Sequence, residues 1–510
     1  MDKLKLFVIS HWLLVIIIII ASFLRLYNIT QLPPGLYPDE AMNGNNALEA
    51  ISTGNFKVFY PENNGREGLF INIQSLSIFI FGNEPWALRS VSAIFGILTV
   101  LGVYFITKEL FSQNRKIALL AAFLIATSFW HINFSRIGFR AITAPFYLTW
   151  ACYFLLKSVR LLKENYSHWK IYAFAVLAGL FYGLGFHSYI AYRATPFLII
   201  TGFACRLFYF KELRKQIIKI FVVFSVFSIL AFLPLGMHFL NHPEDFFGRT
   251  TQISIFNSIT LFKDLEMNIL KTAAMFNFSG DWNWRHNYAG KPQLFWPVGI
   301  LFIIGIILGI SILLKKKNIH SNEQSSNQFK KFSFLMLFLW IIIAALPVIV
   351  SNEGLPHALR AIIMIPPIFI LAGVGGVWAY DKFTKYEYFT NIRIKKIFIV
   401  ACCLFLFALV LEAYYSYFIQ WGRNSNVQGA FSADYVQMGR ELNNLPKELP
   451  KYVIVEAQGV NVRDIPMPSQ TIMFITDTFT PEKQKEKNIY YILPSQINQI
   501  PENSHKVILK

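Results

Sequence analysis

The chain has 510 residues, of which 55% are hydrophobic and only 15% are charged, and 50 of them are phenylalanine. Soluble chains carry about one-quarter charged residues, so this composition excludes one large aqueous domain and indicates that lipid surrounds most of the chain. The formal net charge of +18 does not indicate nucleic-acid binding. The basic residues fall in short clusters between apolar runs, as in the cytoplasmic loops of membrane proteins. We therefore expect the lipid bilayer, and no nucleic acid, among the partners.

About eleven apolar runs are long enough to cross the hydrocarbon core, which takes about 20 residues. They lie at residues 6–26, 87–111, 117–134, 141–161, 171–187, 194–210, 217–240, 294–314, 332–350, 361–380 and 397–418. Lys and Arg gather in alternate loops, for example at Lys315-Lys316-Lys317 and from Lys382 to Lys396. This bias predicts a multi-pass protein of the cell membrane with a cytoplasmic N-terminus and an extracytoplasmic C-terminal segment.

Three long segments fall on the opposite side: residues 27–86, 241–293 and 419–510. Residues 68–82 are apolar but too short to span, which predicts a helix lying along the membrane surface. After residue 418 the sequence has soluble character, with a helix expected at 432–444 and strands near 452–456, 471–475 and 489–493. The chain is thus predicted to be an all-α polytopic membrane protein with a small C-terminal α/β appendage, divided into domains 1–418 and 419–510.

Two adjacent acids follow the first predicted span. Pro38 suits the first position of a helix, which places Asp39 and Glu40 in its first turn. One interpretation is an ordinary helix start, where the helix dipole favours acidic side chains. The other is catalytic, because a carboxylate at the membrane surface can accept the proton of an attacking hydroxyl. The residues alone leave these two interpretations equally open.

Arginines occur in predicted outer loops, where the charge bias of membrane proteins makes them unexpected. Five stand out: Arg66, Arg136, Arg140, Arg193 and Arg360. Any one of them has a plain explanation as an interfacial anchor or a partner in a salt bridge. As a set they favour an anionic lipid headgroup, because guanidinium groups bind phosphate in a bidentate manner.

An aromatic and polar stretch runs from Gly280 to Tyr288 in the second long outer segment. Its candidate carbohydrate-binding residues are Asp281, Trp282, Arg285, His286 and Asn287, because rings stack on sugars and polar groups bind their hydroxyls. An aromatic belt at the membrane interface is an equally good interpretation. His286 has no second metal ligand at a suitable spacing, so the sequence does not define a metal site.

Common nucleotide-binding motifs are absent, because the chain contains no P-loop and no Gly-rich dinucleotide fingerprint. The predicted cytoplasmic loops are too short to hold a nucleotide-sugar domain. A sugar donor would therefore have to reach this protein bound to lipid. The sequence identifies no cofactor with certainty, and it leaves undecided whether the protein binds a divalent metal ion.

Several short motifs together resemble the GT-C glycosyltransferases, and in particular glycosyltransferase family 39. They are Pro38-Asp39-Glu40, Phe81-Gly82, Trp86-Ala87-Leu88-Arg89 and Phe134-Ser135-Arg136-Ile137. Family 39 contains protein O-mannosyltransferases and lipid A aminoarabinose transferases. The resemblance covers residues 6–375 and leaves out the C-terminal segment.

The resemblance implies inverting transfer of a sugar from a polyprenyl-phosphate donor to an extracytoplasmic protein, lipid or glycan. It makes the first outer loop, residues 27–86, the catalytic loop. Asp39 would be the general base, Glu40 would orient a neighbour or the acceptor, and Arg66 would lie near the donor phosphate. We expect some of the five arginines to bind that phosphate. Further sugar- or acceptor-binding candidates are Glu67, His187, Tyr189 and Tyr192. This sequence has Arg140-Ala141 where many family members have an aspartate, so a mechanism with two carboxylates does not carry over.

Two other classes of protein share this hydrophobicity. A lipid or polysaccharide transporter would have many spans, but such proteins usually show internal repeats, and none is visible here. A non-catalytic membrane assembly protein would need neither the acids nor the arginines.

Overall fold

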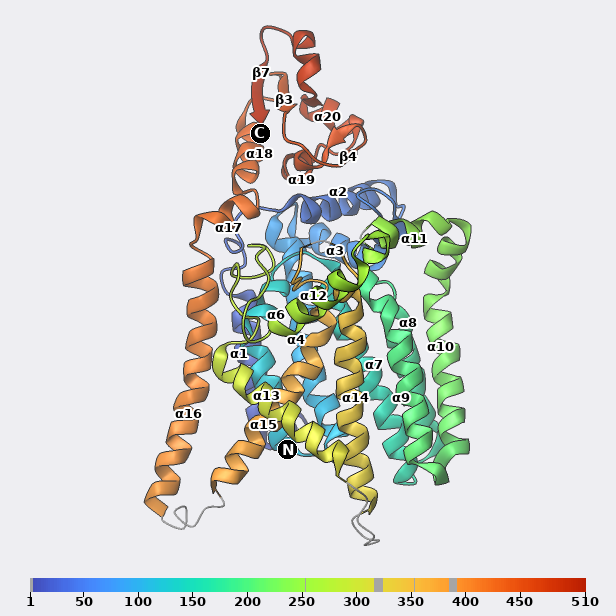
Figure 1. The fold of residues 1–510 in the computed structure, drawn as a ribbon. Helices are drawn as coiled ribbons and strands as arrows, with labels where there is room; N and C mark the ends of the chain where they lie inside the picture. Colours follow the sequence, from blue (N-terminus) through green and yellow to red (C-terminus); the bar gives the residue numbers. More distant parts are fainter. Residues whose placement is uncertain (1–2, 253, 316–323, 353, 385–391) are drawn as a thin grey trace.

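The computed structural model describes residues 3–252, 254–315, 324–352, 354–384 and 392–510, most of which are helical. Long helices stand side by side in a bundle, and the two ends of the chain lie at opposite ends of it (Figure 1). The small C-terminal domain sits on the end of the bundle opposite the N-terminus (Figure 1). The predicted all-α polytopic architecture with an α/β appendage is confirmed.

Every predicted span coincides with a helix or a pair of helices. These are α1 (Lys3–Leu26), α4 (Pro85–Leu110), α5 (Arg115–Ala126) with α6 (Phe129–Phe134), α7 (Thr143–Lys163), α8 (His168–Gly185), α9 (Thr195–Tyr209), α10 (Arg214–Asn241), α13 (Trp296–Leu314), α14 (Gln324–Ile349), α15 (Ile365–Thr384) and α16 (Ile392–Tyr414). Within the described part of the chain, six helices are long and apolar enough to cross a membrane. The predicted span 117–134 is divided because Ser128 starts α6, with its side chain accepting the His131 N–H.

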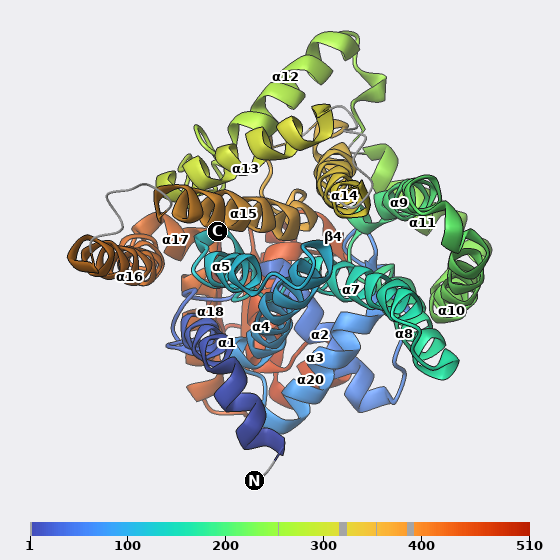
Figure 2. The same ribbon diagram turned by 90° about the horizontal axis from the view of Figure 1, so that it is seen from below.

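The long segments between spans gather at the end that carries the C-terminal domain (Figure 1). The first contains α2 (Pro38–Thr53), the antiparallel pair β1 (Phe59–Tyr60) and β2 (Arg66–Glu67), and α3 (Gly68–Phe81). The next contains α11 (Pro243–Gln252) and α12 (Leu261–Ala274). Helix α2 begins at Pro38, as predicted, and α3 occupies the predicted 68–82 segment. Seen from the opposite end, α2 and α3 lie beside α4, and α12 lies at the outer edge of the bundle beyond α13 (Figure 2).

The C-terminal domain begins after a π-helical turn, Tyr415–Trp421, that extends α16. It contains α17 (Ser425–Ala430), α18 (Ala433–Asn444), α19 (Gln470–Thr476), α20 (Pro481–Lys487), a parallel sheet in the order β6 (Ile489–Ile492), β3 (Lys451–Val455), β7 (His505–Leu509), and a hairpin of β4 (Asn461–Val462) and β5 (Ile465–Pro466). The strand predicted at 471–475 is wrong, because these residues form α19. All of α19 is buried, and a short, wholly buried apolar run fits a helix as well as a strand.

The C-terminal domain is fixed to the first outer loop. Gly44 of α2 lies against the ring of Phe474, and a Cβ atom at this position would collide with that ring. Arg463 forms ion pairs with Glu49 at 2.8 Å and with Glu62 at 3.2 Å. The domain is therefore docked on α2 and on the acids of this loop.

A buried ion pair joins this loop to the bundle. Glu40 and Arg89, which are both almost fully buried, form two N–H···O contacts of 3.0 Å. The same carboxylate accepts the backbone N–H of Gly138 at 2.6 Å. Arg89 also donates to the carbonyls of Pro33 and Gly35. One pair thus holds together the start of α2, the turn before it, α4 and the loop before α7.

We expect Glu40→Ala to lower the free energy of unfolding by about 3–5 kcal/mol, because it leaves the Arg89 guanidinium buried without its counter-charge. Thermal unfolding of the detergent-purified protein measures this loss. The matched control is Glu84→Ala, which removes an exposed partner of Arg440 and should cost under about 1 kcal/mol. Equal melting temperatures for the two variants would contradict the role of the buried pair.

Candidate functional site

A cavity of about 950 Å³ lies between the bundle end and the C-terminal domain. This volume is within the range of about 300–1,000 Å³ typical of small-ligand sites. Its lining comes from six places: the start of α2 with residues 63–66, the loop at 139–141, Tyr189, residues 282–286, residues 354–360, and the C-terminal domain. Segments far apart in the sequence therefore share one site.

Asp39 lines this cavity from the first turn of α2. Its Oδ1 atom accepts a hydrogen bond of 2.6 Å from the Asn63 side-chain amide. The neighbouring Tyr37 is buried enough to raise its pKa to about 12, and the Asp39 charge adds to this rise while Arg285 opposes it. The Tyr37 hydroxyl therefore stays protonated and neutral at physiological pH, beside a carboxylate that faces the cavity.

Arg66 also lines the cavity, and neutral groups support it. Its terminal nitrogens donate to the side-chain carbonyl of Asn43 at 2.7 Å and to that of Asn46. Burial lowers the pKa of Arg66 to about 10, with the charge of Arg140 as the next cause. Arg66 is thus still cationic at physiological pH. Amides do not cancel its charge, and its Nε atom has no hydrogen-bond partner among the described residues.

Glu67 lies behind the cavity wall and is shared by two arginines. Arg140 donates to it from Nε at 2.7 Å and lines the cavity. Arg193 lies 3.5 Å from its other oxygen but turns towards α11, where it donates to the Phe246 carbonyl and faces that ring at 4.3 Å. Arg193 is not part of the cavity lining, so of the two arginines paired with Glu67 only Arg140 lines the cavity.

The remaining arginines fall into two groups, those buried in the bundle and those that line the cavity. Arg136 is fully buried in the bundle, where it donates to backbone carbonyls and faces the Tyr417 ring at 5.2 Å. Arg136 does not line the cavity. Arg360 does, although it is only 7% exposed. Arg285 lines it too, with its guanidinium 4.0 Å from the Tyr37 ring centre. Four arginines therefore face the cavity: Arg66, Arg140, Arg285 and Arg360.

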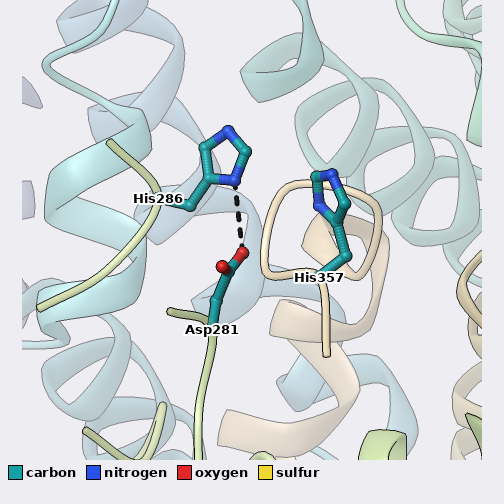
Figure 3. Close-up of side chains that lie close together, drawn as sticks. All are labelled: Asp281, His286 and His357. Atoms are coloured by element: carbon teal, nitrogen blue, oxygen red, sulfur yellow. Dashed lines mark hydrogen bonds and ion pairs between the residues drawn. The ribbon is translucent and has the colours of Figure 1, made fainter. Parts of the chain in front are cut away.

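The Gly280–Tyr288 stretch places its residues in two roles. Trp282 and His286 line the cavity. Asp281 and Asn287 are buried and hold the loop, because Asp281 accepts the Asn283 N–H and the His286 ring N–H (Figure 3), while Asn287 donates to nearby backbone carbonyls. Trp282 and His286 thus lie at the cavity surface, whereas Asp281 and Asn287 lie behind it and hold the loop.

The 187–192 motif contributes one residue to the cavity, Tyr189. His187 bonds through Nε2 to the Ala231 carbonyl on α10 at 3.1 Å. Tyr192 is fully buried against Tyr182. Glu40 likewise faces the bundle, where Arg89 and Gly138 surround its carboxylate.

Several lining residues are not among the candidates chosen from the sequence. Asn43 and Asn63 support Arg66 and Asp39, and they resemble any polar loop residue in the sequence. His357 lies three residues before Arg360 in the same loop, and this nearness to a candidate arginine is visible in the sequence. Nothing in the sequence of residues 458–460 and 467–468 of the C-terminal domain predicts that they line a cavity.

Comparisons with known proteins identify the fold. The family model for dolichyl-phosphate-mannose-protein mannosyltransferase matches residues 69–238, about a third of the chain. The structure is similar to ArnT from Cupriavidus metallidurans bound to undecaprenyl phosphate, with a TM-score of 0.56 and 13% identity over 91% of this chain and 85% of that one. The chain has the GT-C glycosyltransferase fold. The resemblance to GT-C glycosyltransferases that the sequence motifs indicate is confirmed for the fold.

A second GT-C structure is similar over almost the whole chain. It is the oligosaccharyltransferase AglB from Archaeoglobus fulgidus in complex with an inhibitory peptide and a dolichol-phosphate. The TM-score is 0.54 and the identity 14%, over 96% of this chain and 70% of that one. ArnT and AglB are thus both seen with a polyprenyl phosphate. A search of curated protein sequences gives no match.

Proposed function

We propose that this protein is a membrane glycosyltransferase that moves a sugar from a polyprenyl-phosphate donor to a hydroxyl of an extracytoplasmic protein, lipid or glycan. The observation that carries the proposal is the shared cavity, in which one carboxylate, Asp39, faces four guanidinium groups. The GT-C fold and the two neighbours bound to polyprenyl phosphates support it.

The arginines would bind the donor phosphate. Guanidinium groups match phosphate oxygens in a bidentate manner, and among the described residues Arg66 donates hydrogen bonds to two neutral side-chain amides, those of Asn43 and Asn46. Negative charge grows on the phosphate as the sugar leaves, so fixed cations stabilise the transition state more than the bound donor. The buried position of Arg66 and Arg360 strengthens this effect by excluding water.

Asp39 would act on the acceptor. Its carboxylate takes the proton of the acceptor hydroxyl while that oxygen attacks the anomeric carbon from the face opposite the phosphate. The bond between the anomeric carbon and the phosphate oxygen breaks, and the polyprenyl phosphate leaves with its electron pair. The sugar is transferred with inversion, and Glu40 keeps Asp39 in place through Arg89.

The acceptor would enter along the C-terminal domain. The residues of this domain that line the cavity carry no charge: Gly429, Ala430, Ser432, Tyr435, Gln458, Gly459, Val460, Met467 and Pro468. The donor phosphate is better placed at the arginine-lined wall, so the uncharged wall is left for a neutral part of the acceptor. We propose the orientation that the loop charges predict, with this domain outside the cell membrane and the N-terminus in the cytoplasm.

Asp39→Asn tests the general base. We expect turnover with a lipid-linked sugar donor to fall by about 10²–10⁴-fold, since the amide cannot take the proton. We expect donor binding and the melting temperature of Asp39→Asn to be the same as in the wild type. Glu84→Gln, an exposed acid of the same loop, is the control. Turnover near that of the wild type in Asp39→Asn would reject the assignment.

Arg360→Gln tests the phosphate-binding wall. We expect kcat/KM for the donor to fall by about 10²–10³-fold, because one cation that stabilises the leaving phosphate is lost. Arg423→Gln removes an exposed arginine outside the cavity and should have no effect. The proposed wall would be refuted if the two variants had the same steady-state kinetics.

Val460→Trp tests the acceptor wall. Val460 is 52% exposed at the cavity surface, so a larger side chain there should raise KM for the acceptor by about tenfold through steric hindrance. Slow hydrolysis of the donor by water, measured without acceptor, should stay unchanged. Ile508→Trp, at an exposed position on β7, is the control. A parallel fall of acceptor transfer and donor hydrolysis would contradict the assignment of this wall.

A further inference from the structure

Two loops that are distant in the sequence meet at one edge of the cavity. The loop between α12 and α13 carries Asp281 and His286, and the loop after α14 carries His357 (Figure 3). The Oδ2 atom of Asp281 accepts the Ala358 backbone N–H at 2.8 Å and lies 3.2 Å from the His286 Nδ1 atom. The Asp281 carboxylate therefore already joins the two loops.

The side chains of this group have the chemistry and spacing of a metal site. One ligand atom from each of Asp281, His286 and His357 lies within 4.8 Å of the others. Zn²⁺ takes imidazole nitrogen at about 2.0–2.1 Å and carboxylate oxygen at about 2.0–2.2 Å. Ligand atoms around such an ion are thus roughly 3.4 Å apart. Two ligand atoms at the 4.8 Å limit would each move by about 0.7 Å to reach that spacing.

The geometry points to a divalent transition-metal site formed by Asp281, His286 and His357, with Zn²⁺ as the ion that fits best. Two imidazoles and one carboxylate are a ligand set that Zn²⁺ favours over Mg²⁺ and Ca²⁺, which prefer oxygen ligands alone. The Ala358 N–H would orient the ligating carboxylate, as backbone groups do around protein-bound metals. The hydrogen bond between Asp281 and Ala358 is enough to join the two loops. It does not account for two imidazoles lying close to the same carboxylate, and a metal site does.

The site has an open side. His286 and His357 both line the cavity, while Asp281 lies behind them. Three protein ligands leave one position of a tetrahedral ion for another group, and that position would face the cavity. A donor oxygen or a water molecule could occupy it.

Bound metal would also position two of the cavity arginines. Arg285 directly precedes His286, and Arg360 follows His357 by three residues. An ion that joins the two loops would therefore fix the backbone on which both guanidinium groups are carried. This consequence rests on the proposed function, whereas metal binding itself does not.

Calorimetric titration of Zn²⁺ into tag-free, EDTA-treated protein in detergent tests the site. We expect one ion per chain and an affinity that falls at least 100-fold in His357→Ala. His357→Cys, which restores a ligating atom, should recover most of that affinity. His242→Ala is the matched control, because His242 lies beside Glu244 in an exposed acid–histidine pair and should leave affinity unchanged.

Two results would overturn the site: no saturable binding by the wild type, or wild-type affinity in a His357→Ala variant with a normal melting temperature. Mg²⁺ in place of Zn²⁺ should give no measurable heat, and equal binding of both ions would contradict the proposed ligand set. The titration contains no sugar donor, and Asp39→Asn should bind Zn²⁺ as the wild type does. Failure of the metal site is thus distinguishable from failure of the glycosyltransferase proposal.

Discussion

The buried ion pair between Glu40 and Arg89 is the interaction on which the candidate site depends. It joins α2, α4 and the loop at Gly138 with short hydrogen bonds in a place that water does not reach. Successive residues of an α-helix point about 100° apart. Holding Glu40 in the bundle therefore turns the neighbouring Asp39 outwards to the cavity. The two acids of the Pro38-Asp39-Glu40 motif thus differ in role, because Glu40 fixes the helix and Asp39 lines the cavity.

The arginines differ in how their charge is satisfied. Arg25 and Arg136 are buried inside the bundle and donate to main-chain carbonyls, so they tie helices together. Arg66 lines the cavity and has amide partners, which leave its charge in place. Burial costs a cation the most when no anion accompanies it, so an anionic ligand in the cavity would lower that cost. The neutral wall contributed by the C-terminal domain gives the cavity two unlike sides.

Much of the fold follows from the sequence, because a bilayer demands long apolar helices and their loops carry the charge bias. The position of Asp39 at the start of α2 follows from Pro38. The directions of side chains in irregular loops do not: Arg136 and Arg140 are four residues apart, yet one enters the bundle and the other the cavity. The approach of His357 to His286 is likewise a tertiary contact between residues far apart in the chain. The wall formed by residues 458–468 depends on how a whole domain docks.

The most direct test of the account is a cryo-EM structure of the protein with undecaprenyl phosphate. The account predicts phosphate density within hydrogen-bonding distance of at least two of Arg66, Arg140, Arg285 and Arg360. It also predicts that the Asp39 carboxylate faces the same space across a gap wide enough for a sugar. Phosphate density outside this cavity, or a lipid whose headgroup is walled off from Asp39, would contradict it.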